Sequence, residues 1–176
     1  MKHRLLTFFR YALLSFGLAL VCPTLADTMV LNGFQFENPL GTAKATEIGR
    51  GVYSAHWPAD KPYKEADTEM IIVNLGPSTV ETMSEGGGNV YEAILASMMG
   101  LFVEPEEINK TLFMGSTSAR SVYSSSIPRK HVANVFSKKL EDGSFVLVGV
   151  RSFNPSSKES GKLIQSIANT FQKASE

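Results

Sequence analysis

The last apolar segment of the chain, residues 144–153, constrains the fold more than any other segment. Its residues alternate as in a strand, so that Val146, Val148 and Val150 share one face. The opposite face carries large apolar side chains as well, beginning with Phe145. A strand that is apolar on both faces needs a layer of structure on each side. The sequence therefore predicts a central sheet that is covered on both faces.

Alternation and the content of β-branched and aromatic residues predict further strands along the chain. The predicted strand segments are 29–39, 44–57, 70–75, 111–115, 119–127, 131–139 and 144–153. Turn sequences at Asn32-Gly33 and Asp142-Gly143 are typical of tight hairpins. The last four segments therefore predict an antiparallel meander, and the first ones add strands at the N-terminal side.

Two amphipathic helices are predicted by apolar residues at three- and four-residue spacing. The first covers residues 89–102, with an apolar stripe of Val90, Tyr91, Ile94, Leu95, Met98, Leu101 and Phe102. The second follows a capping box of Ser156 and Glu159, with an apolar side of Leu163, Ile164, Ile167, Ala168 and Phe171. Pro105, which lies among three glutamates, suits the first turn of a short additional helix. One face of the sheet can take both long helices, and the other face then needs the N-terminal strands or a second layer.

The first 26 residues predict an export signal. A basic stretch at residues 2–10 precedes an apolar run at 11–21, and a small-residue cleavage site follows at 24–26. The apolar run is shorter than the about 20 residues of a membrane-spanning helix, so a cleaved signal is favoured over an uncleaved anchor. Residues 27–176 would then form a single α/β domain without a membrane span, in the periplasm or outside the cell.

Composition narrows the classes of partner. The leader holds three of the 17 Lys and Arg residues and none of the 17 Asp and Glu residues, so the exported chain carries 14 basic against 17 acidic side chains. Nucleic-acid-binding domains are strongly basic, so nucleic acid is not an expected partner.

The only cysteine, Cys22, lies in the leader. The exported chain therefore has no disulfide, no thiol nucleophile and no thiolate metal ligand. Alternatively, Cys22 is the acylated residue of a lipoprotein, although Val21 is larger than the residue that normally precedes such a cysteine.

The order of the elements resembles a known family. The residues that carry the resemblance are 33–39 (GFQFENP), 114–120 (MGSTSAR), 143–148 (GSFVLV) and 164–171. In this order the chain resembles the Mog1/PsbP-like proteins, including small exported bacterial proteins of the DcrB type. The resemblance implies an α+β fold, mainly antiparallel sheet with two amphipathic helices, arranged as an α/β/α sandwich. It also implies an accessory or binding role, and it transfers no functional residue.

Candidate contact residues are predicted in two places. His56, Trp57 and Tyr63 lie in a stretch that is rich in aromatic residues and prolines, and exposed rings on a loop are typical of a surface that binds a ligand or partner. The alternative for Trp57 is that it folds back onto the sheet as part of the core. Arg120 and Tyr123 predict a second patch in the meander.

No catalytic or metal-binding set is assembled by spacing. The serines between Ser116 and Ser126 lack the Gly-x-Ser-x-Gly elbow. Only His56 and His131 remain as histidines in the exported chain, 75 positions apart, so they make no ligand pair. No catalytic residue, metal or cofactor is therefore predicted.

The preferred interpretation is a non-catalytic exported domain that binds an envelope protein or a small ligand. One alternative is an exported serine hydrolase that uses the 116–126 tract with one of the two histidines. The other alternative is a carrier of a small apolar ligand, in a cavity lined by Met83, Met98 and Met99.

Overall fold

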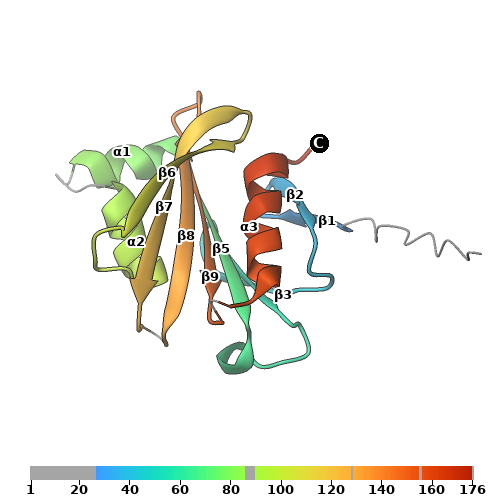
Figure 1. Cartoon of the computed structure of the whole chain (residues 1–176). Coiled ribbons are helices and arrows are strands. Elements are labelled where there is room, and N and C mark those ends of the chain that lie inside the picture. Colours follow the sequence, from blue (N-terminus) through green and yellow to red (C-terminus); the bar gives the residue numbers. More distant parts are fainter. Residues whose placement is uncertain (1–26, 86–89, 128, 155, 176) are drawn as a thin grey trace, which may run out of the picture.

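Two antiparallel sheets make up most of the computed structural model, which describes residues 27–85, 90–127, 129–154 and 156–175 (Figure 1). The strands are β1 (Asp27–Leu31), β2 (Phe34–Asn38), β3 (Lys44–Gly49), β4 (Val52–Trp57), β5 (Thr68–Leu75), β6 (Glu107–Phe113), β7 (Ser116–Ser125), β8 (His131–Lys139), β9 (Phe145–Ser152) and β10 (Gln172–Lys173). The large sheet has the order β3-β4-β5-β9-β8-β7-β6, and the small sheet has the order β1-β2-β10. The predicted leader, with Cys22, lies outside the described residues.

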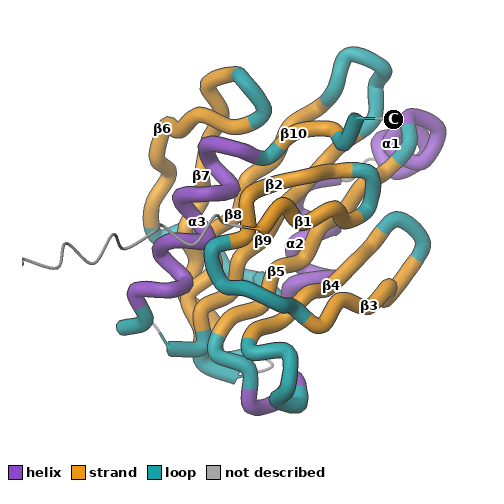
Figure 2. The backbone as a smooth tube through the Cα atoms, turned by 90° about the vertical axis from the view of Figure 1, so that its right-hand side faces the viewer, coloured by secondary structure: helices purple, strands orange, loops and turns teal. Residues whose placement is uncertain are grey.

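Helices cover both faces of the large sheet. They are α1 (Pro77–Glu85), α2 (Val90–Met99) and α3 (Lys158–Thr170), and a single 3-10 turn, η1, spans Tyr63–Glu65. Helices α1 and α2 lie on one face, whereas α3 and the small sheet lie on the other (Figures 1 and 2). The prediction of a mainly antiparallel sheet with few helices is confirmed. The expectation that one face would take both predicted helices is wrong, because α2 and α3 lie on opposite sides.

The two faces enclose separate apolar cores. On the α3 side, Phe171 at the end of the helix stacks on Phe34 and Phe113, with ring centroids 5.0 Å and 5.3 Å apart. On the other side, Ile94 and Leu95 of α2 pack among buried residues of β4, β5, β7, β8 and β9. Strand β9 contributes to both cores, as its two apolar faces predict.

Helix α3 begins one residue later than the capping box predicts. The side chain that accepts the cap hydrogen bond, from the Glu159 amide at 3.2 Å, is that of Ser157. The predicted apolar side is confirmed: Leu163, Ile167 and Phe171 are buried, and the two other residues of that side pack against the same core.

Two elements differ from the predictions. Helix α1 has no counterpart among the predicted helices, and the short helix expected at Pro105 is absent from this described stretch. The chain enters β6 there instead, because the Glu106 amide already donates to the Val122 carbonyl at 2.8 Å. Strand β6 consequently begins four residues before the predicted segment.

Gly51 offers a direct test of the β3–β4 turn. Gly51 and Gly33 both have positive φ angles, of 71° and 77°. A Cβ atom at Gly51 would collide with the Asn74 carbonyl oxygen, whereas a Cβ atom at Gly33 meets nothing within 4 Å. We expect Gly33→Ala to cost about 1 kcal/mol from backbone strain alone and Gly51→Ala to cost at least about 1 kcal/mol more. Urea unfolding measures both, and equal losses would contradict this packing.

Candidate functional site

The predicted contact residues His56 and Trp57 do not form an exposed loop. They are consecutive residues of β4, so their side chains point to opposite faces of the sheet, and they are only 7% and 3% exposed. The Trp57 indole donates to the Gly41 carbonyl at 3.1 Å, so the alternative of a core tryptophan is correct. A nitrogen of His56 lies 3.1 Å from the Lys61 carbonyl oxygen. Only Tyr63, in η1, is partly exposed.

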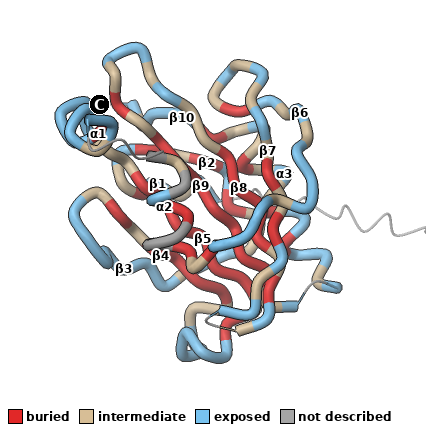
Figure 3. The backbone as a smooth tube through the Cα atoms, turned by 90° about the vertical axis from the view of Figure 1, so that its left-hand side faces the viewer, coloured by how far each residue is buried: buried red, intermediate tan, exposed pale blue. Residues whose placement is uncertain are grey.

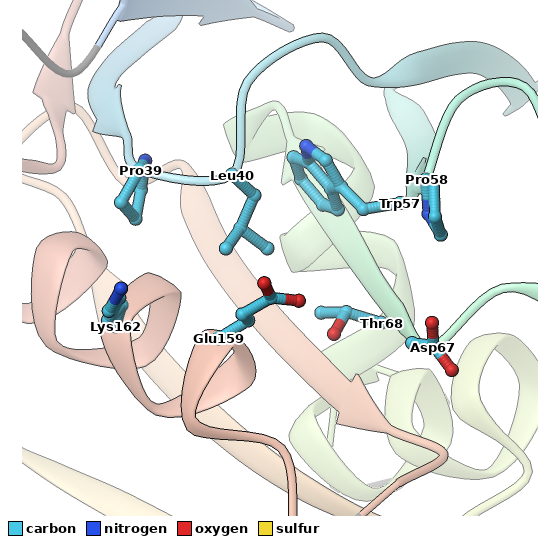
Figure 4. Close-up of a pocket in the computed structure, with 8 residues that line it drawn as sticks. All are labelled: Pro39, Leu40, Trp57, Pro58, Asp67, Thr68, Glu159 and Lys162. Carbon is cyan, nitrogen blue, oxygen red and sulfur yellow. The ribbon is translucent and has the colours of Figure 1, made fainter. Parts of the chain in front are cut away.

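A hollow of about 250 Å³ adjoins Trp57 on the α3 side. The residues that line it are Pro39, Leu40, Trp57, Pro58, Asp67, Thr68, Glu159 and Lys162. Leu40 and the Trp57 ring lie on one side of this hollow, and Glu159 and Lys162 lie across from them (Figure 4). The hollow is small and its rim is charged.

Arg120 and Tyr123 do not form one patch either. They are three positions apart on β7 and therefore face opposite sides of the sheet. Tyr123 is buried on the α2 side, with its hydroxyl 3.0 Å from that of Tyr91, and burial raises its pKa. Arg120 is half-buried opposite Phe136.

An ion pair lies buried at one end of the α2 face. Glu69 of β5 and Arg151 of β9 are directly paired across the two strands, and their closest nitrogen and oxygen atoms are 2.6 Å apart. The carboxylate also accepts from the Ser54 hydroxyl at 2.7 Å and from the Tyr63 hydroxyl at 3.2 Å. Arg151 donates in addition to the Met99 carbonyl at 3.4 Å. The strand residues of this cluster were not predicted, because a single Glu and a single Arg in two distant strands give no local signal.

His131 lies beside this pair and is 1% exposed. Its Nδ1 atom is 2.7 Å from the Arg129 carbonyl oxygen, and its Nε2 atom has no hydrogen-bond partner in the described part of the chain. Burial lowers the pKa of His131, and the charges of Arg151 and Arg129 lower it further, against the raising effects of the hydrogen bond to the Arg129 carbonyl and of the Glu69 charge. A buried imidazole among these cations is neutral at pH 7.

The register brings one serine of the 116–126 tract opposite a histidine. Ser125 is the cross-strand partner of His131. However, the Ser125 hydroxyl donates to the Gly100 carbonyl at 3.4 Å and accepts from the Ile127 amide at 3.2 Å. The hydrogen bond that would activate a nucleophile is therefore not formed. Within the described ranges, no three His, Cys, Asp or Glu residues are grouped closely enough to hold a metal ion.

Exposed apolar side chains gather around β6 and the segment before it. We call the following five residues the β6 surface. They are Phe102, Val103, Ile108, Leu112 and Ile127, and their exposed fractions are 71%, 55%, 67%, 50% and 58%. Only two other large hydrophobic residues of the described chain are as exposed, and they belong to β1 and β3. Strand β6 lies beyond the area that α1 and α2 cover (Figure 3).

Two hollows open on the β6 surface, on either side of Phe102 and Val103. One, of about 460 Å³, is also lined by Tyr91, Leu101, Ile108 and Tyr123. The other, of about 400 Å³, is also lined by Ser125, Ile127, Lys130 and His131. The hollow of about 400 Å³ is mainly apolar, whereas the hollow of about 460 Å³ is also lined by Glu104 and Ser121 and is about as polar as apolar. Apolar walls with a few polar groups are suited to binding apolar side chains or small apolar molecules.

The sequence pattern missed the β6 surface because it treated Leu101 and Phe102 as one buried stripe. Helix α2 ends at Met99, since Gly100 adopts a positive φ of 62°. The Leu101 amide then bonds back to the Leu95 carbonyl at 3.1 Å, so that Leu101 is buried while Phe102 turns outward. The glycine directly before this apolar run was the available signal.

The prediction that Met83, Met98 and Met99 line a ligand cavity is not confirmed for Met83 and Met99. Met99 is fully buried and packs tightly on Gly149 of β9, where it fills the core. Neither Met83 nor Met99 lines the two hollows beside α2. The Met98 side chain lies outside what the structure describes.

No protein-family model matches the sequence, and no curated protein is significantly similar to it. In the described part of the chain, no helix is both long enough and apolar enough to cross a membrane.

His131 predicts a specific loss of stability in mild acid. Its ordinary pKa of 6.5 applies to the unfolded chain, and the folded state holds it lower. As the pH falls below about 6.5, the unfolded state binds a proton that the folded state resists, so the free energy of unfolding falls. It levels off below the folded-state pKa.

We expect His131→Gln, which removes the titrating ring, to lose this part of the pH dependence. Urea unfolding between pH 7.5 and 5 measures it. An unchanged slope in the variant would contradict a neutral buried His131.

The buried ion pair predicts a non-additive pair of substitutions. Arg151→Met leaves the Glu69 carboxylate buried without its cation and should cost about 3–5 kcal/mol. Adding Glu69→Gln removes the second charge and keeps an acceptor for Ser54, so the double variant should be more stable than Arg151→Met alone. As a control, Lys61→Met breaks the pair with Asp67, which is 46% exposed on both sides, and should cost less than about 1 kcal/mol. If the losses in free energy of unfolding of Arg151→Met and Glu69→Gln alone add up to that of the double variant, the coupling between the two residues is contradicted.

Proposed function

We propose that residues 27–176 form an exported, non-catalytic binding domain of the periplasm or extracellular space, and that the β6 surface contacts another envelope protein. The N-terminal leader and the absence of a basic surplus support export and a protein partner rather than nucleic acid. We also propose that the fold is a Mog1/PsbP-like α/β/α sandwich. Helices on both faces of an antiparallel sheet support this assignment.

The observation that carries the proposal is the group of five exposed apolar side chains on and beside β6, four of which line two hollows. Exposed apolar area costs roughly 25 cal/mol per Å², so a soluble chain gains stability when such a patch is covered. Contiguous exposed apolar patches of this kind mark interaction sites. Large aromatic and aliphatic side chains beside hollows are also the usual anchors of protein interfaces.

A small apolar ligand is the second candidate. The hollow of about 460 Å³ is within the size range of ligand pockets, and Tyr123 offers a hydroxyl at its base. Ligand pockets bury most of their ligand, however, whereas Phe102 at the rim is 71% exposed. This openness favours a protein partner over an enclosed ligand.

The test uses a photo-crosslinking amino acid at Phe102 in the native envelope, with the same probe at Ile48 on β3 as the control. Ile48 is 53% exposed and lies at the opposite edge of the sheet. We expect one discrete protein to be linked from position 102 only. The purified partner should then bind Phe102→Ser at least tenfold more weakly, about 1.4 kcal/mol, and bind Ile48→Ser unchanged.

Equal binding by both variants would contradict the proposal. Native mass spectrometry of the exported chain separates the alternatives: a bound small molecule that the Phe102→Ser variant loses would favour the ligand carrier. Labelling of the chain by a fluorophosphonate probe, lost in Ser125→Ala, would instead favour the hydrolase.

A further inference from the structure

The two edges of the large sheet are built differently. Strand β3 forms one edge and carries a register shift between Glu47 and Gly49, and such irregularities discourage pairing with another strand. Strand β6 forms the other edge and pairs with β7 in unbroken register over its whole length. In the described part of the chain, no strand lies on the outer side of β6. This outer side therefore presents a regular edge that can accept another strand.

The side chains of β6 that share a face with the hollows alternate in character. Ile108, Lys110 and Leu112 lie on this face. All three are exposed. The face therefore presents an apolar, a basic and an apolar side chain in turn.

We propose that β6 binds an extended segment of the partner protein as an added antiparallel strand, an inference that rests on the proposed function and specifies how the partner binds. The complementary segment carries apolar side chains opposite Ile108 and Leu112 and an acidic side chain opposite Lys110. It reads apolar-x-acidic-x-apolar. Backbone hydrogen bonds supply affinity in such an added strand, and the alternate side chains supply specificity.

A second copy of this chain is a poorer occupant of the same edge. The antiparallel register that places Ile108 of one copy opposite Leu112 of the other also places Lys110 directly opposite Lys110. Like charges at directly opposed positions are destabilising. A slip of one residue turns the apolar side chains of the incoming strand to the other face of the sheet. The positive charge of Lys110 thus disfavours this self-pairing and fits a partner with an acidic side chain at that position.

The test uses a labelled peptide, Thr-Val-Thr-Glu-Thr-Val-Thr, and fluorescence anisotropy with residues 27–176. We expect saturable binding, at least tenfold weakening when the central Glu of the peptide is replaced by Lys, and recovery of that Lys peptide by Lys110→Glu. Lys44→Glu on β3 is the matched control and should leave both affinities unchanged. Lys110 and Lys44 are both exposed strand residues, so neither change affects the core.

Absence of saturable binding, or failure of Lys110→Glu to recover the Lys peptide, overturns strand addition. If the partner linked through Phe102 still loses affinity in Phe102→Ser, the proposed function stands and only the binding mode is wrong. A concentration-dependent dimer of the exported chain that Leu112→Thr dissociates would show that a second copy occupies the edge, and would also overturn the proposal.

Discussion

The limited area that α1 and α2 cover on their face of the large sheet determines which part of this protein is left open (Figure 3). A ten-residue helix spans about 15 Å, whereas strands of nine or ten residues, such as β7 and β8, span about 30 Å. Helices α1 and α2 together cover the central strands of their face and stop short of the β6 edge (Figure 3). The parts of the sheet beyond them must be closed by polar contacts or remain exposed, and both solutions are present.

At the end of β5 and β9, polar contacts close the sheet. The Glu69–Arg151 pair and its hydroxyl donors lie at the C-terminal end of α2, where Arg151 also donates to the Met99 carbonyl. Arg129 adds further contacts. Its guanidinium donates to the Tyr63 and Ala66 carbonyls, and its central carbon lies 3.5 Å from the centroid of the Phe153 ring. These contacts join η1 to the meander. The β6 edge has no equivalent contacts among the described residues on its outer side, so its apolar side chains stay available for a partner.

The sequence predicts best those elements whose signal is local. Strand β8, the Asp142-Gly143 hairpin and the buried side of α3 follow from alternation, turn chemistry and helical spacing. The candidate site is predicted poorly from the sequence. It depends on which face of the sheet each strand residue points to and on neighbours that are distant in the sequence. His56 and Trp57 lie on a buried strand rather than a loop, and Arg120 and Tyr123 fall on opposite faces of β7. The outward turn of Phe102 depends on one glycine, Gly100, which periodicity alone does not weigh.

Hydrogen–deuterium exchange tests the central claim most directly, because it reports on the backbone of both sheet edges in one experiment. Residues 27–176 are measured alone and with the partner linked through Phe102. If the partner binds at the open edge, the amides of β6 (Glu107–Phe113) exchange more slowly in the complex, and those of β3 (Lys44–Gly49) are unchanged. Unchanged exchange in β6, or protection confined to β3, would contradict the assignment of the β6 surface as the binding site.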